Sequence, residues 1–250
     1  MINFSSISQK SILGRTMRIF LKLIPQNTKL FILQGKLKGK KWIKGSGVNG
    51  YWLGSYEPEE RKFFEEIVKK GDAVFDIGSH VGFYALLASE LVGEDGKVFA
   101  FEPLPRNIKY LREHIKINNI KNINVIEAAV SDKEGTAFLE NKGDGSYAKI
   151  VKNKGFEVKT VVLDNLIKSG KLPAPDIIKI DVEGAEFSVL KGVAFILKKY
   201  RPAIFLSIHI FDDKIHKNCC DFLKNAGYNL KSIAGNSLNG INEIFAYKND

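Results

Sequence analysis

The stretch Val74-Phe-Asp-Ile-Gly-Ser-His-Val-Gly82 decides the fold. It is an apolar run that reaches Asp76, followed by a turn between Gly78 and Gly82. A strand, a glycine turn and a following helix form a βα unit whose backbone can lie close to a ligand. The next apolar run ends in Glu102, 20 residues after Gly82. A carboxylate at that point can accept hydrogen bonds from the two hydroxyls of a ribose, so the pair predicts a site for an adenosine-type cofactor.

The spacing of the two glycines separates two kinds of cofactor. A pyrophosphate cradle needs Gly-x-Gly-x-x-Gly, whereas three other residues, with a bulky one in the middle, lie between Gly78 and Gly82. Asp76 would place a negative charge beside a diphosphate, and the same charge suits the ammonium of a methionine group. The sequence therefore favours S-adenosylmethionine over a nicotinamide dinucleotide. The alternative is an ordinary βα turn in an α/β domain.

Length and composition fit one main α/β domain. The chain has 250 residues, 44% of them hydrophobic, and shows no internal repeat. No apolar run reaches the length of a membrane span, and the N-terminal sequence lacks a small-residue cleavage site, so we expect a cytoplasmic protein. The adjacent Cys219 and Cys220 lack metal-ligand spacing and are expected to be packing residues.

Positive charge is concentrated at the N-terminal end. Residues 1–56 hold ten Lys or Arg and no Asp or Glu, so residues 57–250 carry 28 of each sign and the net charge of +10 belongs to the first segment. We therefore predict a basic N-terminal extension or lid over 1–56 and a cofactor-binding domain over 57–250.

Residues 10–24 have helical spacing, with Arg15, Arg18 and Lys22 on one stripe and Pro25 at the end. One interpretation is a helix that packs on the domain and leaves its cations in water. The other is a surface, within residues 10–44, that contacts an anionic membrane at the inner face or a polyanionic substrate. The same electrostatics would suit nucleic acid, which we rank lower because no RNA-binding module is visible.

From residue 57 the pattern alternates between helix and strand, which is typical of a mostly parallel sheet with helices on both faces. Helices are expected to begin near Pro58 and end before Gly71, and to lie near 82–91, 105–118 and 213–226. Strands are expected at 73–77, 97–101, 123–130, 177–181, 203–207, 228–233 and 243–247. Between them, residues 136–162 predict an inserted β-hairpin whose strands are 136–139 and 158–162.

Polar residues gather where the expected strands end. Asp181 closes the fourth strand, Glu183 and Glu186 follow it, and His209 lies two residues beyond the fifth. Ligands of open parallel sheets sit beyond the carboxyl ends of the strands. The alternatives are acids that favour the first turn of a helix, which fits Glu186 better than Asp181, and a core histidine.

Taken together, these runs resemble the FkbM family of S-adenosylmethionine-dependent methyltransferases over residues 45–210. The resemblance is carried, in order, by Gly50-Tyr-Trp-Leu-Gly-Ser-Tyr-Glu-Pro58, Phe75-Asp-Ile-Gly-Ser-His-Val-Gly-Phe-Tyr84, Phe101-Glu-Pro103, Glu127-Ala-Ala-Val-Ser-Asp132, Leu163-Asp164, Ile178-Lys-Ile-Asp-Val-Glu-Gly-Ala-Glu186 and Ser207-Ile-His209. It implies a class I methyltransferase, Rossmann-like fold with seven strands, the last antiparallel. It also implies O-methylation of a hydroxyl on a sugar, glycan or natural product. The chain has Ser79-His80 where the family often has a small residue and Asn.

The resemblance implies a set of cofactor-binding positions. These are Glu57, Asp76, Gly78, Ser79, His80, Gly82, Phe83, Glu102, Pro103, Ala128, Ala129, Val130 and Asp181. The glycine turn would approach the methionine end, Glu102 would hold the ribose, and Pro103 with Ala128 to Val130 would border the adenine. Tyr51, Trp52 and Tyr56 would form an apolar wall against a sugar, or else pack the N-terminal segment on the core.

A sugar hydroxyl needs a general base, because it does not ionise at neutral pH. His209 is the first candidate, with Asp181 or Glu183 orienting it or taking the proton directly. A rival is Mg²⁺ held by Asp181 and Glu183, which we rank lower because no second aspartate follows the fifth strand. Two other functions stay open: an RNA methyltransferase that uses the basic segment, and a non-catalytic cofactor-binding protein.

Overall fold

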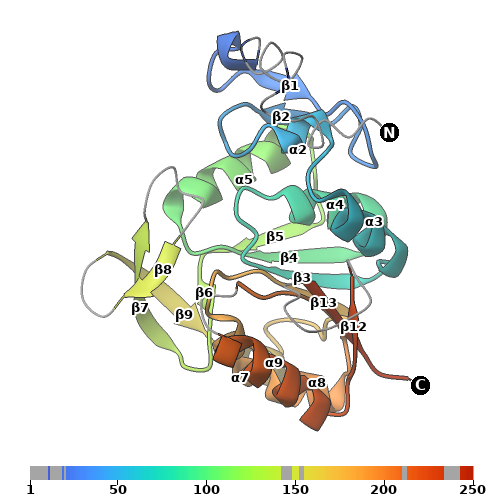
Figure 1. The fold of residues 1–250 in the computed structure, drawn as a ribbon, viewed down its shortest axis with the longest axis vertical. Coiled ribbons are helices and arrows are strands. Elements are labelled where there is room, and N and C mark those ends of the chain that lie inside the picture. The colour runs from blue at the N-terminus through green and yellow to red at the C-terminus, as the bar shows by residue number, and fades with distance from the viewer. Residues whose placement is uncertain are drawn as a thin grey trace.

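The centre of the fold is a seven-stranded sheet (Figure 1). The computed structural model describes residues 11, 19, 21–141, 148–151, 155–209, 213–233 and 243–249. Across the sheet the strand order is β12 (Asn229–Ser232), β13 (Glu243–Tyr247), β11 (Ala203–Ser207), β10 (Ile177–Ile180), β3 (Ala73–Ile77), β4 (Lys97–Phe101) and β5 (Ile123–Ile126). Six of these strands run in one direction and β13 runs opposite to them. The predicted seven strands and the antiparallel last strand are confirmed.

Helices cover both faces of this sheet, as predicted for a class I methyltransferase fold (Figure 1). One face carries α3 (Pro58–Ile67), α4 (Phe83–Val92) and α5 (Pro105–Ile117), and the other carries α6 (Leu163–Lys168), α7 (Glu186–Gly192), α8 (Ala194–Lys199) and α9 (Asp213–Asn225). Alternate residues of β3 separate the two cores, since Val74 packs toward α4 while Phe75 and Ile77 pack toward α7 and α8. Pro58 and Pro105 open their helices at positions where proline suits the first turn.

The insertion is larger than the predicted hairpin. The antiparallel pairing of β7 (Gly135–Asn141) with β9 (Phe156–Val161) is confirmed, but β8 (Ala148–Val151) adds a strand on the other edge of β7. The expected strand 123–130 is wrong as one element, because its second half, β6 (Ala129–Val130), leaves the main sheet and pairs with β9. The chain turns between the two halves, where the amide of Ala128 donates to the carbonyl of Ile126 at 2.9 Å.

The N-terminal segment contains a short β-ribbon that forms its own two-stranded sheet and contacts α5. Most of the expected helix 10–24 lies outside the described residues, although residues 21–23 are helical. Beyond it, β1 (Lys29–Phe31) and β2 (Lys41–Ile43) pair antiparallel, and α2 (Gly50–Leu53) follows. Among the described helices none is both long and apolar enough to cross a bilayer.

His114 of α5 joins this ribbon to the glycine turn. Its ring stacks on Trp42 with 3.8 Å between centroids, its Nε2 accepts the amide hydrogen of Ile43 at 3.1 Å, and its Nδ1 lies 2.8 Å from the carbonyl oxygen of Val81. Burial lowers the pKa of His114 to about 4, so the ring is neutral and Nδ1 is the donor. This is a core histidine with both nitrogens satisfied.

Candidate active site

A cavity of about 400 Å³ opens at the carboxyl ends of β3, β4, β10 and β11. Sixteen of the residues singled out in the sequence line it: Tyr51, Tyr56, Glu57, Asp76, Gly78, Ser79, His80, Phe83, Glu102, Pro103, Ala128, Ala129, Val130, Asp181, Glu183 and His209. Trp52 and Gly82 do not line it. The cavity lies at the edge of the sheet where the sequence placed a ligand.

The glycine turn is fixed by the backbone around it. Gly78 has φ +84°, and a Cβ there would lie 1.8 Å from the carbonyl oxygen of Asp181. The amides of Gly78 and Ser79 both donate to the carbonyl of Phe101, at 2.9 and 3.0 Å. Gly82, with φ +96°, precedes α4, and a Cβ there would lie 2.4 Å from Leu111 Cδ1. Gly82 therefore serves helix packing, while Gly78 lets two strands approach beside the cavity.

Glu102 is buried at the end of β4 and receives several protein hydrogen bonds. Its Oε2 accepts the amide hydrogen of His80 at 2.8 Å, and its Oε1 accepts from the amide of Leu104 at 3.0 Å and from Asn107 Nδ2 at 3.2 Å. Burial raises its pKa to about 7, and these donors oppose that rise. The carboxylate is thus held in one orientation beside the cavity. Asn107, which the sequence analysis did not single out, belongs to this arrangement.

Lys179 is a buried cation that the sequence analysis passed over. It lies opposite Asp76 in the pairing of β10 with β3, and its Nζ donates to Asp181 Oδ2 at 2.9 Å and lies 4.4 Å from the centre of the Tyr84 ring. Burial opposes its charge, but Asp181, Asp76 and Glu57 raise its pKa above the usual value. A lysine inside the apolar run Ile177-Ile-Lys-Ile of a central strand is unusual, because lysine is rarely buried without a partner. This feature of the sequence could have indicated a buried ion pair.

Asp76 and Asp181 respond differently to this lysine. Burial raises the pKa of Asp76 to about 6, although Lys179 opposes the rise, and neither carboxylate oxygen makes a hydrogen bond of ordinary geometry to a described residue. Burial also acts on Asp181, but the adjacent Lys179 ammonium outweighs it and lowers the pKa of Asp181. Asp76 thus presents a buried carboxylate whose oxygens have no well-aligned donor in the described part of the chain, although Ser79 and the amide of Ala85 are near enough to oppose the rise of its pKa.

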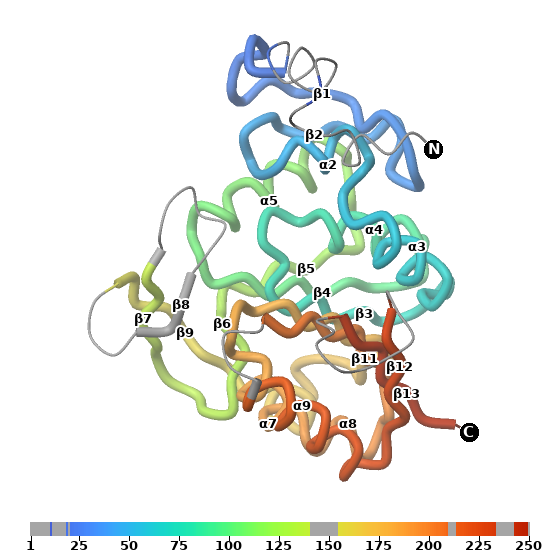
Figure 2. Tube along the Cα trace, viewed as in Figure 1, coloured from blue at the N-terminus to red at the C-terminus, as the bar shows by residue number. Residues whose placement is uncertain are grey.

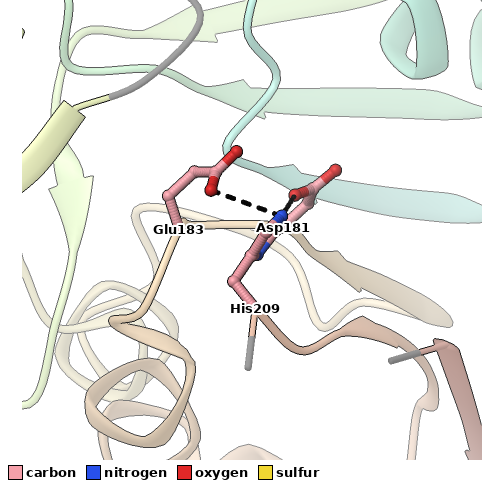
Figure 3. Close-up of side chains that lie close together, drawn as sticks. All are labelled: Asp181, Glu183 and His209. Atoms are coloured by element: carbon pink, nitrogen blue, oxygen red, sulfur yellow. Dashed lines mark ion pairs between the residues drawn. The ribbon is translucent and has the colours of Figure 1, made fainter. Parts of the chain in front are cut away.

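Asp181, Glu183 and His209 converge from β10 and β11 (Figure 3). His209 Nε2 lies 3.4 Å from Glu183 Oε2 and 3.7 Å from Asp181 Oδ1. On the other side of the ring, His209 Nδ1 lies 3.1 Å from Oε1 of the fully buried Glu186. Burial disfavours the charged ring, but Glu186, Asp181 and Glu183 together raise the pKa of His209 to about 9.

The same three residues of Figure 3 also satisfy the first requirement of a cation site. One ligand atom from each of Asp181, Glu183 and His209 lies within 4.8 Å of the other two. Oxygen and imidazole ligands at this spacing can hold a divalent ion. The arrangement therefore offers two chemistries, a proton acceptor or a metal ligand set, from one group of side chains.

Glu186 is the functional residue that sequence reasoning underrated. Its position in the first turn of α7 explained it as a helix-terminus acid. In the structure its Oε1 also accepts the amide hydrogen of Gly184 at 2.9 Å and faces the ring of His209. Only the fold places β11 beside α7, so the pairing of Glu186 with His209 had no sequence signature.

Aromatic rings form the wall of the cavity nearest the N-terminal segment. Tyr51 stacks on Phe83 with 5.1 Å between centroids and meets Tyr56 at 4.4 Å. The Tyr51 hydroxyl lies 3.4 Å from His80 Nδ1. Trp52 instead donates from its indole nitrogen to Asn49 Oδ1, away from the cavity. Two of the three predicted aromatic residues therefore reach the site.

Three of the six non-glycine residues with positive φ in the described part of the chain line the cavity. Glu57, His80 and Glu183 are non-glycine residues with φ of +39°, +51° and +53°, and all three line it. Such conformations cost of order 1–3 kcal/mol each and persist where the surrounding structure enforces them, commonly at functional sites. At Glu57 the strained backbone opens α3, and the side chain accepts a hydrogen bond from the Tyr84 hydroxyl at 2.9 Å.

Comparison with known proteins assigns this architecture to a family. The model of the methyltransferase FkbM domain matches residues 76–230, which run from the end of β3 to the start of β12 and include most of the residues that line the cavity. The chain belongs to the FkbM methyltransferase family. The resemblance inferred from the sequence motifs is confirmed.

Individual relatives are distant. The hexuronic acid methyltransferase AglP of Haloferax volcanii is 30% identical over 147 residues, which are 58% of this chain and 59% of AglP. The match thus spans about three fifths of that relative's length. Among solved structures, a putative rRNA-methylase from Clostridium thermocellum has a TM-score of 0.51 at 12% identity and covers 75% of this chain and 91% of its own. The FkbM methyltransferase from Methylobacillus flagellatus has a TM-score of 0.49 at 15% identity, and the alignment covers 80% of this chain and 55% of that protein.

Proposed function

We propose that the protein transfers the methyl group of S-adenosylmethionine to a hydroxyl of a sugar or glycan. The observation that carries the cofactor assignment is the pair of buried carboxylates, Asp76 and Glu102, at the ends of adjacent strands beside one cavity. Membership of a methyltransferase family and the 30% identity to a hexuronic acid methyltransferase support the reaction and the sugar class.

The residues of the cavity fit a cofactor with a ribose and a cationic methionine group. Glu102 would accept from the ribose hydroxyls, since its carboxylate is fixed at the mouth of the sheet. Asp76 would face the ammonium, which would supply a well-aligned donor to buried oxygens that have none among the described residues. When bound, S-adenosylmethionine supplies an electrophilic methyl group on a sulfonium sulfur. Three further acids that line the cavity, Asp181, Glu57 and Glu183, favour a positively charged ligand.

His209 is the proposed base for the acceptor hydroxyl. Its Nδ1 is oriented by Glu186, so Nε2 is the nitrogen presented to the cavity between Asp181 and Glu183. A pKa of about 9 means that the free enzyme holds the ring protonated at neutral pH, and the deprotonated fraction is a strong base. We therefore expect kcat/KM to rise with pH until about 9.

The first experiment measures calorimetric binding of S-adenosylmethionine and S-adenosylhomocysteine. The wild type is compared with Glu102→Ala and with the matched control Glu94→Ala, which removes an exposed carboxylate. Loss of two charge-assisted hydrogen bonds predicts a Kd at least about a hundredfold higher for Glu102→Ala and an unchanged Kd for Glu94→Ala. Absence of saturable binding to the wild type would overturn the assignment.

The second experiment tests the acceptor and the base together. Transfer of labelled methyl to uronic acids and neutral sugars is measured for the wild type and His209→Gln, with and without EDTA. We expect His209→Gln to lower kcat about 10²-fold to 10⁴-fold and to leave cofactor Kd unchanged. Loss of turnover in EDTA, restored by Mg²⁺ or Mn²⁺, would contradict the role of His209 as base and assign the residues of Figure 3 to a metal.

A further inference from the structure

Exposed apolar side chains are concentrated on the N-terminal segment. Seven large hydrophobic residues are exposed in the described part of the chain, and five of them lie within residues 19–48. Ile19 is 61% exposed, Leu23 71%, Phe31 59% and Leu33 48%. Large apolar side chains gathered on one surface mark an interaction site more often than scattered ones do.

The β-ribbon sets the direction of these side chains. Along residues 29–33, Leu30 is partly buried and Ile32 is 1% exposed, whereas the alternate positions are exposed. Successive strand residues point to opposite faces, so Lys29, Phe31 and Leu33 share the outer face. Phe31 lies directly opposite Lys41 in the antiparallel pair, and Lys41 is exposed on that face too.

The preceding helical turn lies next to this face. Residues 21–23 are helical, and the amide and hydroxyl of Thr28 donate to the carbonyl of Pro25 in the turn that leads from this segment into β1. Figures 1 and 2 place these residues, β1 and β2 at one end of the molecule, with α8 and α9 at the other. We call this surface the ribbon face, formed by Ile19, Lys22, Leu23, Lys29, Phe31, Leu33 and Lys41.

The ribbon face carries only positive charge. Exposed lysines 22, 29, 36, 38 and 41 surround its apolar residues, and residues 1–56 contain no Asp or Glu. Lys40 at the edge is neutralised by Glu90 of α4 at 2.9 Å. Cations around protruding apolar side chains match an anionic bilayer surface, where lysines meet headgroups and apolar groups enter the acyl boundary. A nucleic acid would use the lysines and could stack a base on Phe31, but it would give the exposed aliphatic side chains of Ile19, Leu23 and Leu33 no partner.

We propose that the ribbon face binds the surface of an anionic lipid bilayer peripherally. The contact needs no spanning helix, because it combines electrostatic attraction with shallow burial of Ile19, Leu23, Phe31 and Leu33. The surface is separate from the residues assigned to methyl transfer, so the proposal does not depend on the identity of the acceptor.

Cosedimentation of the full chain with 100 nm vesicles tests the proposal. Vesicles of phosphatidylcholine alone are compared with vesicles containing 30% phosphatidylglycerol. We expect binding to the anionic vesicles, loss of it in 1 M NaCl, and little binding to the neutral ones. Replacing Lys22, Lys29 and Lys41 by Gln should lower the partition coefficient about a hundredfold, since each lysine near such a surface contributes about 1 kcal/mol.

The apolar half is tested separately. Leu23→Ser with Phe31→Ser should weaken vesicle binding at least about tenfold. The matched controls are Phe156→Ser, which removes another exposed ring, and Lys198→Gln with Lys217→Gln and Lys224→Gln, which remove exposed charges elsewhere; both should bind normally. Circular dichroism and S-adenosylmethionine binding verify that each variant is folded.

Three outcomes would overturn the proposal. They are equal binding to neutral and anionic vesicles, serine variants that bind as the wild type does, and RNA binding that the triple lysine variant loses while vesicle binding is absent. Concentration-dependent dimerisation that the serine variants abolish, without vesicle binding, would assign the ribbon face to a second copy of the chain.

Discussion

Replacing Glu186 by glutamine removes one negative charge beside His209 and keeps the shape of the side chain. Glu186 Oε1 faces three donors, the amide of Gly184 at 2.9 Å, the amide of His209 at 3.4 Å and His209 Nδ1 at 3.1 Å. The amide oxygen of glutamine can accept from the same donors. The new NH₂ group takes the place of Oε2, which has no hydrogen-bond partner among the described residues. An unpaired buried donor costs about 1–3 kcal/mol, so the variant folds with reduced stability.

The size of the expected change follows from the pKa of His209. Against the cost of burial, its three carboxylate neighbours raise the pKa from 6.5 to about 9, which corresponds to about 3 kcal/mol. The hydrogen bond to Glu186 is the largest contribution in that direction. We therefore expect Glu186→Gln to lower the pKa of His209 by at least about one pH unit. Because the folded pKa is raised, the pairing stabilises the fold fully below pH 6.5 and is lost as pH rises through about 9.

NMR titration of the imidazole Cε1 protons measures this directly, because the chain has only four histidines. His209→Gln assigns the resonance, and Glu243→Gln is the matched control, since Glu243 is a cavity acid that bonds to Ser207. The pH at which kcat/KM rises should fall in Glu186→Gln by the same amount as the pKa of His209 measured by NMR. A pKa of His209 unchanged in Glu186→Gln, or moved equally by Glu243→Gln, would refute the reasoning.

Three further substitutions probe the frame of the site. Gly78→Ala should lower the free energy of unfolding by more than about 3 kcal/mol in urea titrations, because its Cβ would lie 1.8 Å from the backbone oxygen of Asp181. A variant as stable as the wild type would contradict the close approach of Gly78 to Asp181. Lys179→Met should cost about 3–5 kcal/mol by removing the buried cation that Asp181 and Asp76 face, and a neutral result would count against this role of Lys179. The pKa of His114 in the folded state is lowered to about 4, so its contribution to the free energy of unfolding is complete above pH 6.5, and about 3 kcal/mol of it is lost as pH falls toward 4. His114→Phe should remove this part of the acid sensitivity. A pH profile of stability that is unchanged in this variant would contradict the assignment.

The sequence predicted those elements whose boundaries are marked by local chemistry. Residues 73–77 are an apolar run before a glycine turn, and β3 has these bounds. The run 123–130 carried no such mark, because the chain leaves the main sheet at Ile126 through a turn made by ordinary residues. β1 and β2 are three residues each and contain lysines, so their pairing gives no strand periodicity.

The residues of the candidate site also divide into those that the local sequence predicts and those that depend on tertiary neighbours. Asp76, Glu102, Asp181 and His209 could be placed because strand ends of a parallel sheet share one edge. Lys179 and Glu186 could not be assigned a role, because each depends on a partner across the sheet or on a helix packed beside another strand. The local sequence pattern therefore predicts where the cavity lies, whereas the pKa values of its residues depend on neighbours that only the tertiary structure brings together.

The link through His114 bears on how this protein can be recombined with its relatives. One imidazole holds Ile43 of the ribbon and Val81 of the glycine turn at the same time. Exchanging the N-terminal segment between homologues to change acceptor preference would therefore disturb the cofactor turn, unless the donor segment brings a backbone amide to the same nitrogen. The ribbon, the glycine turn and α5 form one structural unit, so chimaeras are better joined beyond α5 than at residue 56.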